Sequence, residues 1–415
     1  MARFTKDIQY YKFGFYGFLK NLRLFEPFLI LFFLESGLSY LQIGILYSFR
    51  EIARNILEIP AGVLADASGR RRSMVASFSA YIASFMAFYF GHSYSLFFGA
   101  MLLFAVGDAF RTGTHKAMIF DYLKMKGWAN QKADYYGHTR AFSQFGSAIS
   151  SLLSAALVFY SGSFRFIFVI TAIPYFLDLI LLLSYPKELD GPIGNQSPQK
   201  ISTRFKMVFK EFYQTFRKGS VFKVIISISW YSGYYKVIKD FIQPMIVGLA
   251  IGIPLLISYS GQQKTALIIG PVYFVIYLLT SLSSKNTEKI NRKFSSQENA
   301  LNKLMFMGIA AGVFASIAYI YGFIELAVVI MIPVFLIENI RKPLGVSVIA
   351  DNSNKNILAS ALSVQSQIQT IIVMITAPVL GYFSDKYGLE KGLFITSLVF
   401  LIFSFLLKIR TLNTN

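Results

Sequence analysis

The sequence predicts an all-α, polytopic membrane protein with twelve transmembrane helices in two six-helix bundles. The first observation is composition: 55% of the 415 residues are hydrophobic and 17% are aromatic, which is far more apolar than a soluble domain. The second is a series of apolar runs, each of about twenty residues and therefore long enough to cross a bilayer. The third is the position of the Lys and Arg residues, which gather in alternate loops between the runs.

The longest hydrophilic stretch, 185–220, divides the predicted spans into two sets of six. We therefore expect an N-terminal bundle at 1–184, a cytoplasmic linker with an amphipathic, interfacial helix at 185–220, and a C-terminal bundle at 221–415. The predicted spans lie near 13–35, 41–65, 73–92, 95–122, 138–161, 164–184, 221–247, 260–283, 301–321, 323–347, 357–383 and 391–409.

The loop charges predict that both termini are cytoplasmic, by the positive-inside rule.

A net charge of +19 could indicate a nucleic-acid-binding protein, but the basic residues lie in short loops between apolar runs and not on one soluble face. We expect no cleavable signal peptide, because the N-terminal residues lack a short apolar core followed by a small-residue cleavage site. The absence of cysteine excludes disulfides, thiolate metal sites and cysteine nucleophiles.

The turn between the second and third spans reads Gly-Val-Leu-Ala-Asp-Ala-Ser-Gly-Arg-Arg-Arg, from Gly62 to Arg72. A small residue at its start permits close helix packing, and a glycine before the arginines permits a tight turn. This turn resembles the loop between helices two and three of the major facilitator superfamily, except that Ala67 stands where the family usually has a basic residue. The motif residues are Gly62, Asp66, Gly69, Arg70 and Arg71.

The resemblance implies the major facilitator fold and transport by alternating access. It also implies that Asp121, at the cytoplasmic end of span four, pairs with Arg70 in one conformational state. The alternative is an ordinary surface ion pair, which contributes about 0–1 kcal/mol. A second Gly-x-x-x-Asp-x-x-Gly sequence, Gly381 to Gly388, follows span eleven, but the copy expected after span eight is absent.

Ionisable residues within the predicted spans are the candidate substrate and coupling residues, because a charge in the membrane is costly unless it faces a cavity or a partner. Structural ion pairing between neighbouring helices is the alternative for each cluster. The candidates are Glu26 on span one; Arg50, Glu51, Arg54 and Glu58 on span two; Asp108, Arg111, His115 and Lys116 on span four; Lys236, Lys239 and Asp240 on span seven; and Glu338 on span ten.

The set on span four is the strongest of these candidates. Asp108, Arg111 and His115 share one helix face, and an imidazole titrates near neutral pH in the absence of other influences. The run Gly107–Gly113 resembles in part the span-four pattern of the family, in which an intramembrane Arg is linked to proton coupling. The Gln usual in that pattern is missing here.

We therefore expect a secondary active transporter for a small anionic or zwitterionic organic solute, in a bacterial-type cytoplasmic membrane. Proton coupling is expected, with Glu26 or Asp108 releasing the proton. We expect export, because export is common among members of the family that the turn resembles. The alternatives are a proton-coupled multidrug or cation exporter and a non-transporting receptor; an enzyme is not expected, because nucleotide-binding, metal-binding and nucleophile motifs are missing. The expected partners are the bilayer, the substrate and protons, with no nucleic acid, cofactor or metal, and the expected state is a monomer.

Overall fold

The computed structural model describes residues 4–191, 203, 206, 219–251, 258–351 and 355–409. These residues are helical apart from short turns, and none of them forms a strand. Helices satisfy their own backbone hydrogen bonds, as a membrane interior requires. The amphipathic helix expected within 185–220 lies almost entirely outside the described residues.

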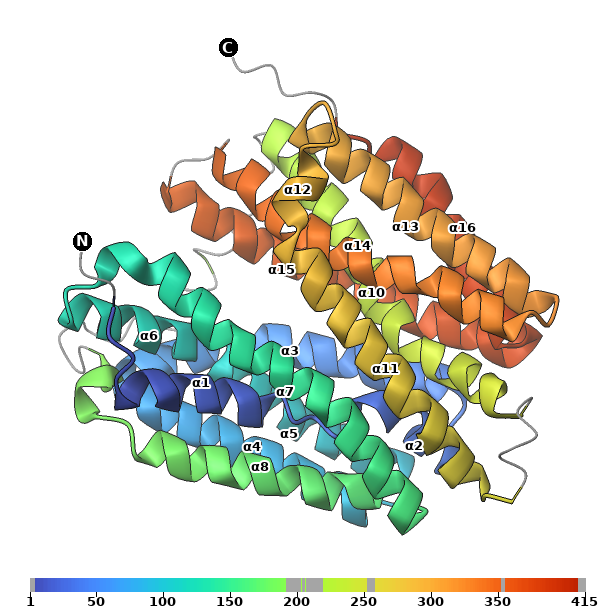
Figure 1. The fold of residues 1–415 in the computed structure, drawn as a ribbon, viewed down its shortest axis with the longest axis horizontal. Helices are drawn as coiled ribbons and strands as arrows, with labels where there is room; N and C mark the ends of the chain where they lie inside the picture. The colour runs from blue at the N-terminus through green and yellow to red at the C-terminus, as the bar shows by residue number, and fades with distance from the viewer. Residues whose placement is uncertain are drawn as a thin grey trace. The chain divides into compact units, whose positions relative to one another are not determined.

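The chain runs through long helices that are interrupted at two places within predicted spans, between α1 and α2 and between α5 and α6 (Figure 1). The helices are α1 (Ile8–Lys20), α2 (Leu29–Glu35), α3 (Tyr40–Ser68), α4 (Arg70–Phe90), α5 (Tyr94–Arg111), α6 (Thr114–Met125), α7 (Lys132–Ser161), α8 (Phe166–Leu183), α10 (Gly219–Ile251), α11 (Gly261–Lys285), α12 (Thr287–Asn291), α13 (Gln297–Ile320), α14 (Ile324–Asp351), α15 (Lys355–Tyr387) and α16 (Leu389–Leu406), with short 3-10 turns at Glu26–Phe28, Ala129–Gln131 and Lys187–Asp190.

Within the described residues, eight helical segments are long and apolar enough to cross a membrane. They coincide with the predicted spans three to six, eight, nine, eleven and twelve. The other four predicted spans correspond to α1–α2, α3, α10 and α14, which all carry ionisable residues near their middles. The multi-pass helical architecture is therefore confirmed, and the number twelve stays a prediction.

The chain forms two compact units. The first contains Met1–Leu29, Phe49–Arg204 and Ser260–Phe274, and the second contains Ile30–Ser48, Phe205–Tyr259 and Val275–Asn415. Most of the first unit comes from the N-terminal half of the chain, and most of the second comes from the C-terminal half. There are two exceptions: the second unit includes Ile30–Ser48, and the first unit includes Ser260–Phe274. The division into bundles at 1–184 and 221–415 remains a prediction from span counting.

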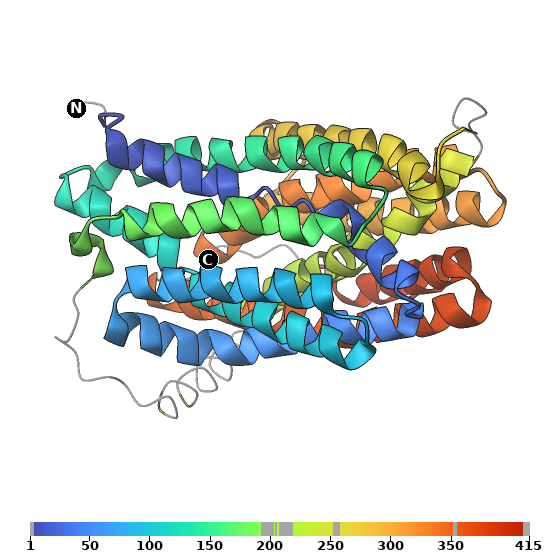
Figure 2. The same cartoon turned by 90° about the horizontal axis from the view of Figure 1, so that it is seen from below.

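In the first unit, α4 packs against α5 and α8, and α1 packs against α7 and α8 (Figure 2). Asp7 caps the start of α1 by accepting a hydrogen bond from the Tyr10 backbone N–H at 2.9 Å. The core where these helices meet is aromatic. Tyr175 of α8 makes edge contacts with Tyr81 and Phe85 of α4, at centroid distances of 5.3 and 4.9 Å. Such pairs bury large apolar surfaces while leaving the phenol groups for hydrogen bonding.

In the second unit, α10 packs against α14 and α15, and α13 packs against α14 and α16. The Ser296 side chain caps α13 by accepting from the Asn299 backbone N–H at 3.1 Å. The Trp230 ring of α10 stacks on the Phe400 ring of α16, with a centroid distance of 4.2 Å. The Trp230 indole N–H also donates to the Phe400 backbone carbonyl. This unit thus has its own buried core.

Candidate functional site

The break between α5 and α6 places Arg111 at the end of a helix and not in the middle of one. Gly113 has a φ of +77°, which a residue with a side chain adopts only with strain, and α6 begins at the next residue. The Asp108 carbonyl oxygen accepts both the Thr112 backbone N–H, at 3.0 Å, and the Thr112 hydroxyl, at 2.7 Å. Span four, predicted as one continuous helix, is therefore two helices.

Asp108 is the centre of a charged cluster in the first unit. One of its carboxylate oxygens lies 3.4 Å from Arg111 Nη2 and 3.9 Å from Arg23 Nη2. The Tyr81 hydroxyl donates to the same oxygen, and Arg111 Nε donates to the Tyr81 hydroxyl oxygen at 3.1 Å. Arg23 comes from the turn between α1 and α2, and Tyr81 comes from α4. Two cations thus share one carboxylate, and the cluster carries a net positive charge.

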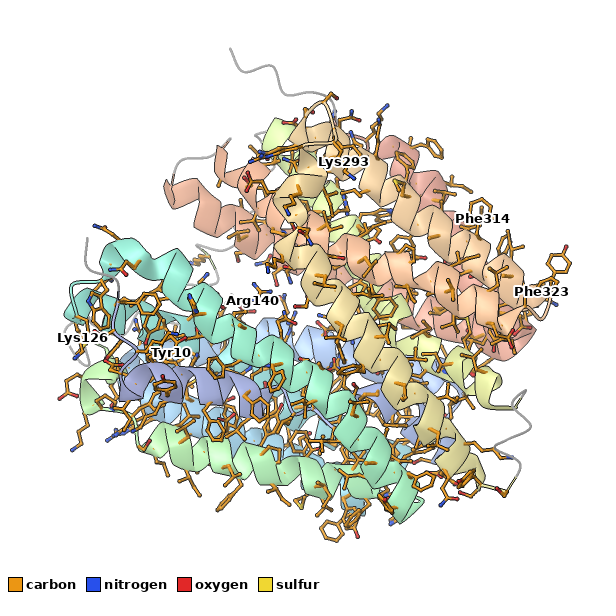
Figure 3. The ribbon with its side chains drawn as sticks, in the orientation of Figure 1. Tyr10, Lys126, Arg140, Lys293, Phe314 and Phe323 are labelled. Carbon is orange, nitrogen blue, oxygen red and sulfur yellow. The ribbon has the colours of Figure 1, made fainter. Side chains whose placement is uncertain are left out.

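A pocket of about 220 Å³ adjoins this cluster. Its described lining contains five basic side chains and no acidic one. Lys20 comes from α1, Arg111 from α5, His115 and Lys116 from α6, and Arg140 from α7. Figure 3 labels Arg140 on α7. Because unlike charges attract and like charges repel, a pocket with this lining favours an anion and opposes a free cation.

His115 lies among aromatic rings at the edge of this pocket. Its imidazole stacks on Tyr16 with a centroid distance of 3.7 Å, and its Nε2 atom lies 3.3 Å from the Tyr185 hydroxyl. Phe13 contacts it edge-on at 5.5 Å. Lys116 lies over the Phe120 and Tyr136 rings, at 5.4 and 5.6 Å. Cation–π contacts of this kind hold an ammonium group in place without neutralising it.

The charges on α3 are arranged around Glu51, which is 2% exposed. Its carboxylate oxygens lie 3.3 Å from Arg50 Nη2 and 3.1 Å from Arg54 Nη2. Arg54 therefore pairs with the acid one turn before it on the same helix. Glu26 occupies the first position of the short turn Glu26–Phe28.

In the second unit, the predicted residues form two separate groups. Lys239 Nζ lies 2.6 Å from an oxygen of Asp240. Glu338 of α14 is buried, and both of its oxygens accept hydrogen bonds from the Ser232 hydroxyl of α10, at 2.8 and 3.0 Å.

A family model described as Major Facilitator Superfamily matches residues 20–371. The chain belongs to the Major Facilitator Superfamily. It is therefore a multi-pass membrane transporter and not an enzyme, as the sequence predicted.

Similar proteins agree with this assignment. An uncharacterised MFS-type transporter of Bacillus subtilis (strain 168), YxaM, is 25% identical over 400 residues, which cover 95% of this chain and 94% of the relative. The crystal structure of the nucleoside transporter NupG has a TM-score of 0.75 at 14% identity and covers 97% of this chain and 98% of its own. A bacterial homologue of the human lysosomal transporter Spinster, in an inward-facing and occupied conformation, has a TM-score of 0.67 at 14% identity, with coverage of 98% and 97%. The two solved structures establish the shared fold.

The superfamily turn after α3 is held by acids from two other segments. Arg70 pairs with Asp121 of α6, as the sequence resemblance implied, and Lys124 lies 3.1 Å from the same carboxylate. Asp190, from the short turn after α8, accepts the Arg71 backbone N–H at 2.8 Å. Gly69 has a φ of +97°, and a Cβ atom built on it would lie 3.1 Å from the Asp190 side chain. A larger residue at this position would be strained by the backbone conformation and would press against the Asp190 side chain.

Sequence reasoning missed Lys20 and Arg140 of the pocket, Tyr81 beside Asp108, and Asp190 beside the superfamily turn; it also missed Asp178, a buried acid of α8. Asp178 is a single acid within a strongly apolar run, and its position in a span was a usable signal. Asp190 lay in the linker, where acids are common.

Proposed function

We propose that this transporter moves a small anionic or zwitterionic organic solute by alternating access, coupled to protons. The observation that carries the proposal is the pocket in the first unit, whose described lining has five basic side chains and no acidic one: Lys20, Arg111, His115, Lys116 and Arg140. A carboxylate or phosphate group would accept hydrogen bonds from Arg111 and Lys20, and such charge-assisted bonds are strong in a site that excludes water. A zwitterion would place its negative end here.

A cationic substrate is less well supported, because two acids of the first unit, Asp108 and Glu51, already have cationic partners. Asp108 is bound by Arg23 and Arg111, and Glu51 is bound by Arg50 and Arg54. A cationic drug would have to displace arginine from these acids.

The remaining parts of the proposal rest on loop charge and family frequency. We propose a monomer in a bacterial-type cytoplasmic membrane with both termini cytoplasmic, because Lys and Arg gather in the loops on that side. Export is the direction that family frequency favours, and the assay below measures direction independently.

Counterflow into proteoliposomes, with a pH dye trapped inside, tests the function. The probes are succinate, lactate, glutamate and inorganic phosphate, with a quaternary ammonium compound as the cationic comparison. We expect exchange of at least one anion, a fall of more than about tenfold in Arg111→Gln, and little change in the matched surface control Arg292→Gln, whose side chain is 76% exposed. Exchange of the cation alone would contradict the proposal.

A further inference from the structure

A second acid of the first unit, Asp178 on α8, is in an unusual environment. Its exposure is 0%, and neither carboxylate oxygen has a hydrogen-bond partner among the described residues. An ionised carboxylate without partners in an apolar interior is far less stable than a neutral carboxylic acid. The proton therefore stays on Asp178 in this conformation.

Asp178 lies close to the basic pocket through its neighbours on α1. One turn before it on α8, the Tyr175 hydroxyl donates to the Lys20 backbone carbonyl at 3.0 Å. The Lys20 side chain lines the pocket, and its charge acts on Asp178 without forming an ion pair with it. Two phenols also interact with the carboxyl, Tyr16 of α1 and Tyr185 just beyond α8, and phenols stay neutral at physiological pH. Beyond them lies His115, which stacks on Tyr16 and contacts the Tyr185 hydroxyl.

Asp108 offers a direct contrast within the same unit. It has two arginines and a tyrosine hydroxyl around one oxygen, so its negative charge is stabilised. An acid held in this way retains its charge when the substrate arrives, unless both arginines leave. Asp108, which the sequence had offered as a proton-releasing group, therefore suits the task less well than an acid with no partner.

We propose that Asp178 is the residue that carries the coupling proton. This inference rests on the proposed function, because it takes the pocket at Lys20 as the anion site. With an anion in the pocket, Lys20 is engaged and the carboxyl keeps its proton. In this conformation Asp178 is already protonated before the anion binds. After the change to the opposite-facing conformation the anion leaves and Lys20 pairs with Asp178: the O–H bond breaks, the proton passes to water, and the carboxylate is stabilised by the ammonium group.

The scheme predicts that proton and anion move in the same direction, one proton for each turnover. Under an inwardly directed proton gradient this gives uptake, in place of the export that family frequency favours. Since the proton is bound with the anion and released with it, a dissipated proton gradient leaves exchange intact and abolishes accumulation.

Infrared spectroscopy of the full-length protein in lipid at neutral pH tests the protonation directly and needs no substrate. We expect a C=O stretching band of a protonated carboxyl group that disappears in Asp178→Asn and persists in Asp108→Asn and Glu338→Gln. Lys20→Gln is a second variant: the band should be present with or without Lys20. A band that is absent from the wild type and appears only in Lys20→Gln would show an ionised, paired Asp178 and overturn the proposal.

Transport by Asp178→Asn tests the coupling role, with whichever of succinate, lactate, glutamate and phosphate gives the fastest wild-type counterflow. The Asn side chain resembles the neutral acid, so we expect counterflow within about twofold of wild type and loss of accumulation driven by a proton gradient. Gradient-driven accumulation that survives in this variant would overturn the inference. If the wild type exchanges none of the four anions, the proposed function fails, and the infrared result still decides the protonation of Asp178.

Discussion

The two units treat a buried arginine in opposite ways. Arg341 of α14 is 1% exposed; its Nε donates to the Leu301 carbonyl at 3.1 Å, its Nη2 donates to Ser227, and its guanidinium lies 4.8 Å from the Tyr231 ring centroid. Arg111 shares a single acid with another arginine and lines a pocket. The first arrangement uses the charge to join helices, and the second leaves positive charge available to a ligand.

This difference shows that an arginine within a membrane span has no fixed role. Arg341 takes backbone carbonyls from neighbouring helices, which makes it part of the packing. Arg111 ends its helix at the break before Gly113, so its guanidinium is not enclosed on all sides. The surroundings of the guanidinium, and not its position in a span, separate structural from functional charge.

The largest expected effect is the loss of stability in Arg341→Met. Two buried carbonyl oxygens lose their donor and Glu338 loses a nearby cation, so we expect a destabilisation of about 3 kcal/mol. The measurement is the thermal unfolding temperature of the purified protein in detergent. Arg111→Met is the matched variant and should unfold close to the wild-type temperature while losing transport. The opposite ranking of the two unfolding temperatures would contradict the comparison.

A smaller effect is expected in Tyr81→Phe, which removes the hydroxyl that bridges Asp108 and Arg111 and keeps the ring. A hydrogen bond to a charged group typically contributes about 1.5 kcal/mol or more, so KM for the transported anion should rise roughly tenfold. Counterflow at several substrate concentrations measures this change.

The matched control for that experiment is Tyr231→Phe in the second unit, whose hydroxyl donates to the Val334 carbonyl at 3.0 Å. It should lower stability slightly and leave KM unchanged. Equal effects of the two tyrosines on KM would show that the first unit has no special part in binding.

The smallest effect is expected in Arg70→Gln, at the pair with Asp121 outside the pocket. A surface ion pair contributes about 0–1 kcal/mol, so the turnover rate should change by no more than about fivefold, with KM unaltered. The control is Lys124→Gln, which removes the more exposed partner of the same acid. A rise in KM in Arg70→Gln would extend the functional region beyond the pocket and weaken the contrast between the two units.

Much of the architecture was accessible from the sequence because the bilayer imposes a simple length and hydropathy rule. The pairing of Asp108 with Arg111 was also accessible, because residues three apart on a helix lie side by side. Spacing alone left several partners in reach, and the structure shows Arg54 beside Glu51 and Lys239 beside Asp240.

The sequence by itself determined the class of protein, a multi-pass helical transporter of the Major Facilitator Superfamily. It also identified the turn after α3 as the family motif and Arg111 as the leading candidate for a substrate or coupling residue. Only the tertiary structure brought Lys20 of α1 and Arg140 of α7 to the same pocket as Arg111, and only it showed Asp178 buried without a partner. The physical reason is that hydropathy and helix periodicity act along the chain. The charge of a pocket and the partners of a buried acid depend on side chains that packing brings together from distant helices.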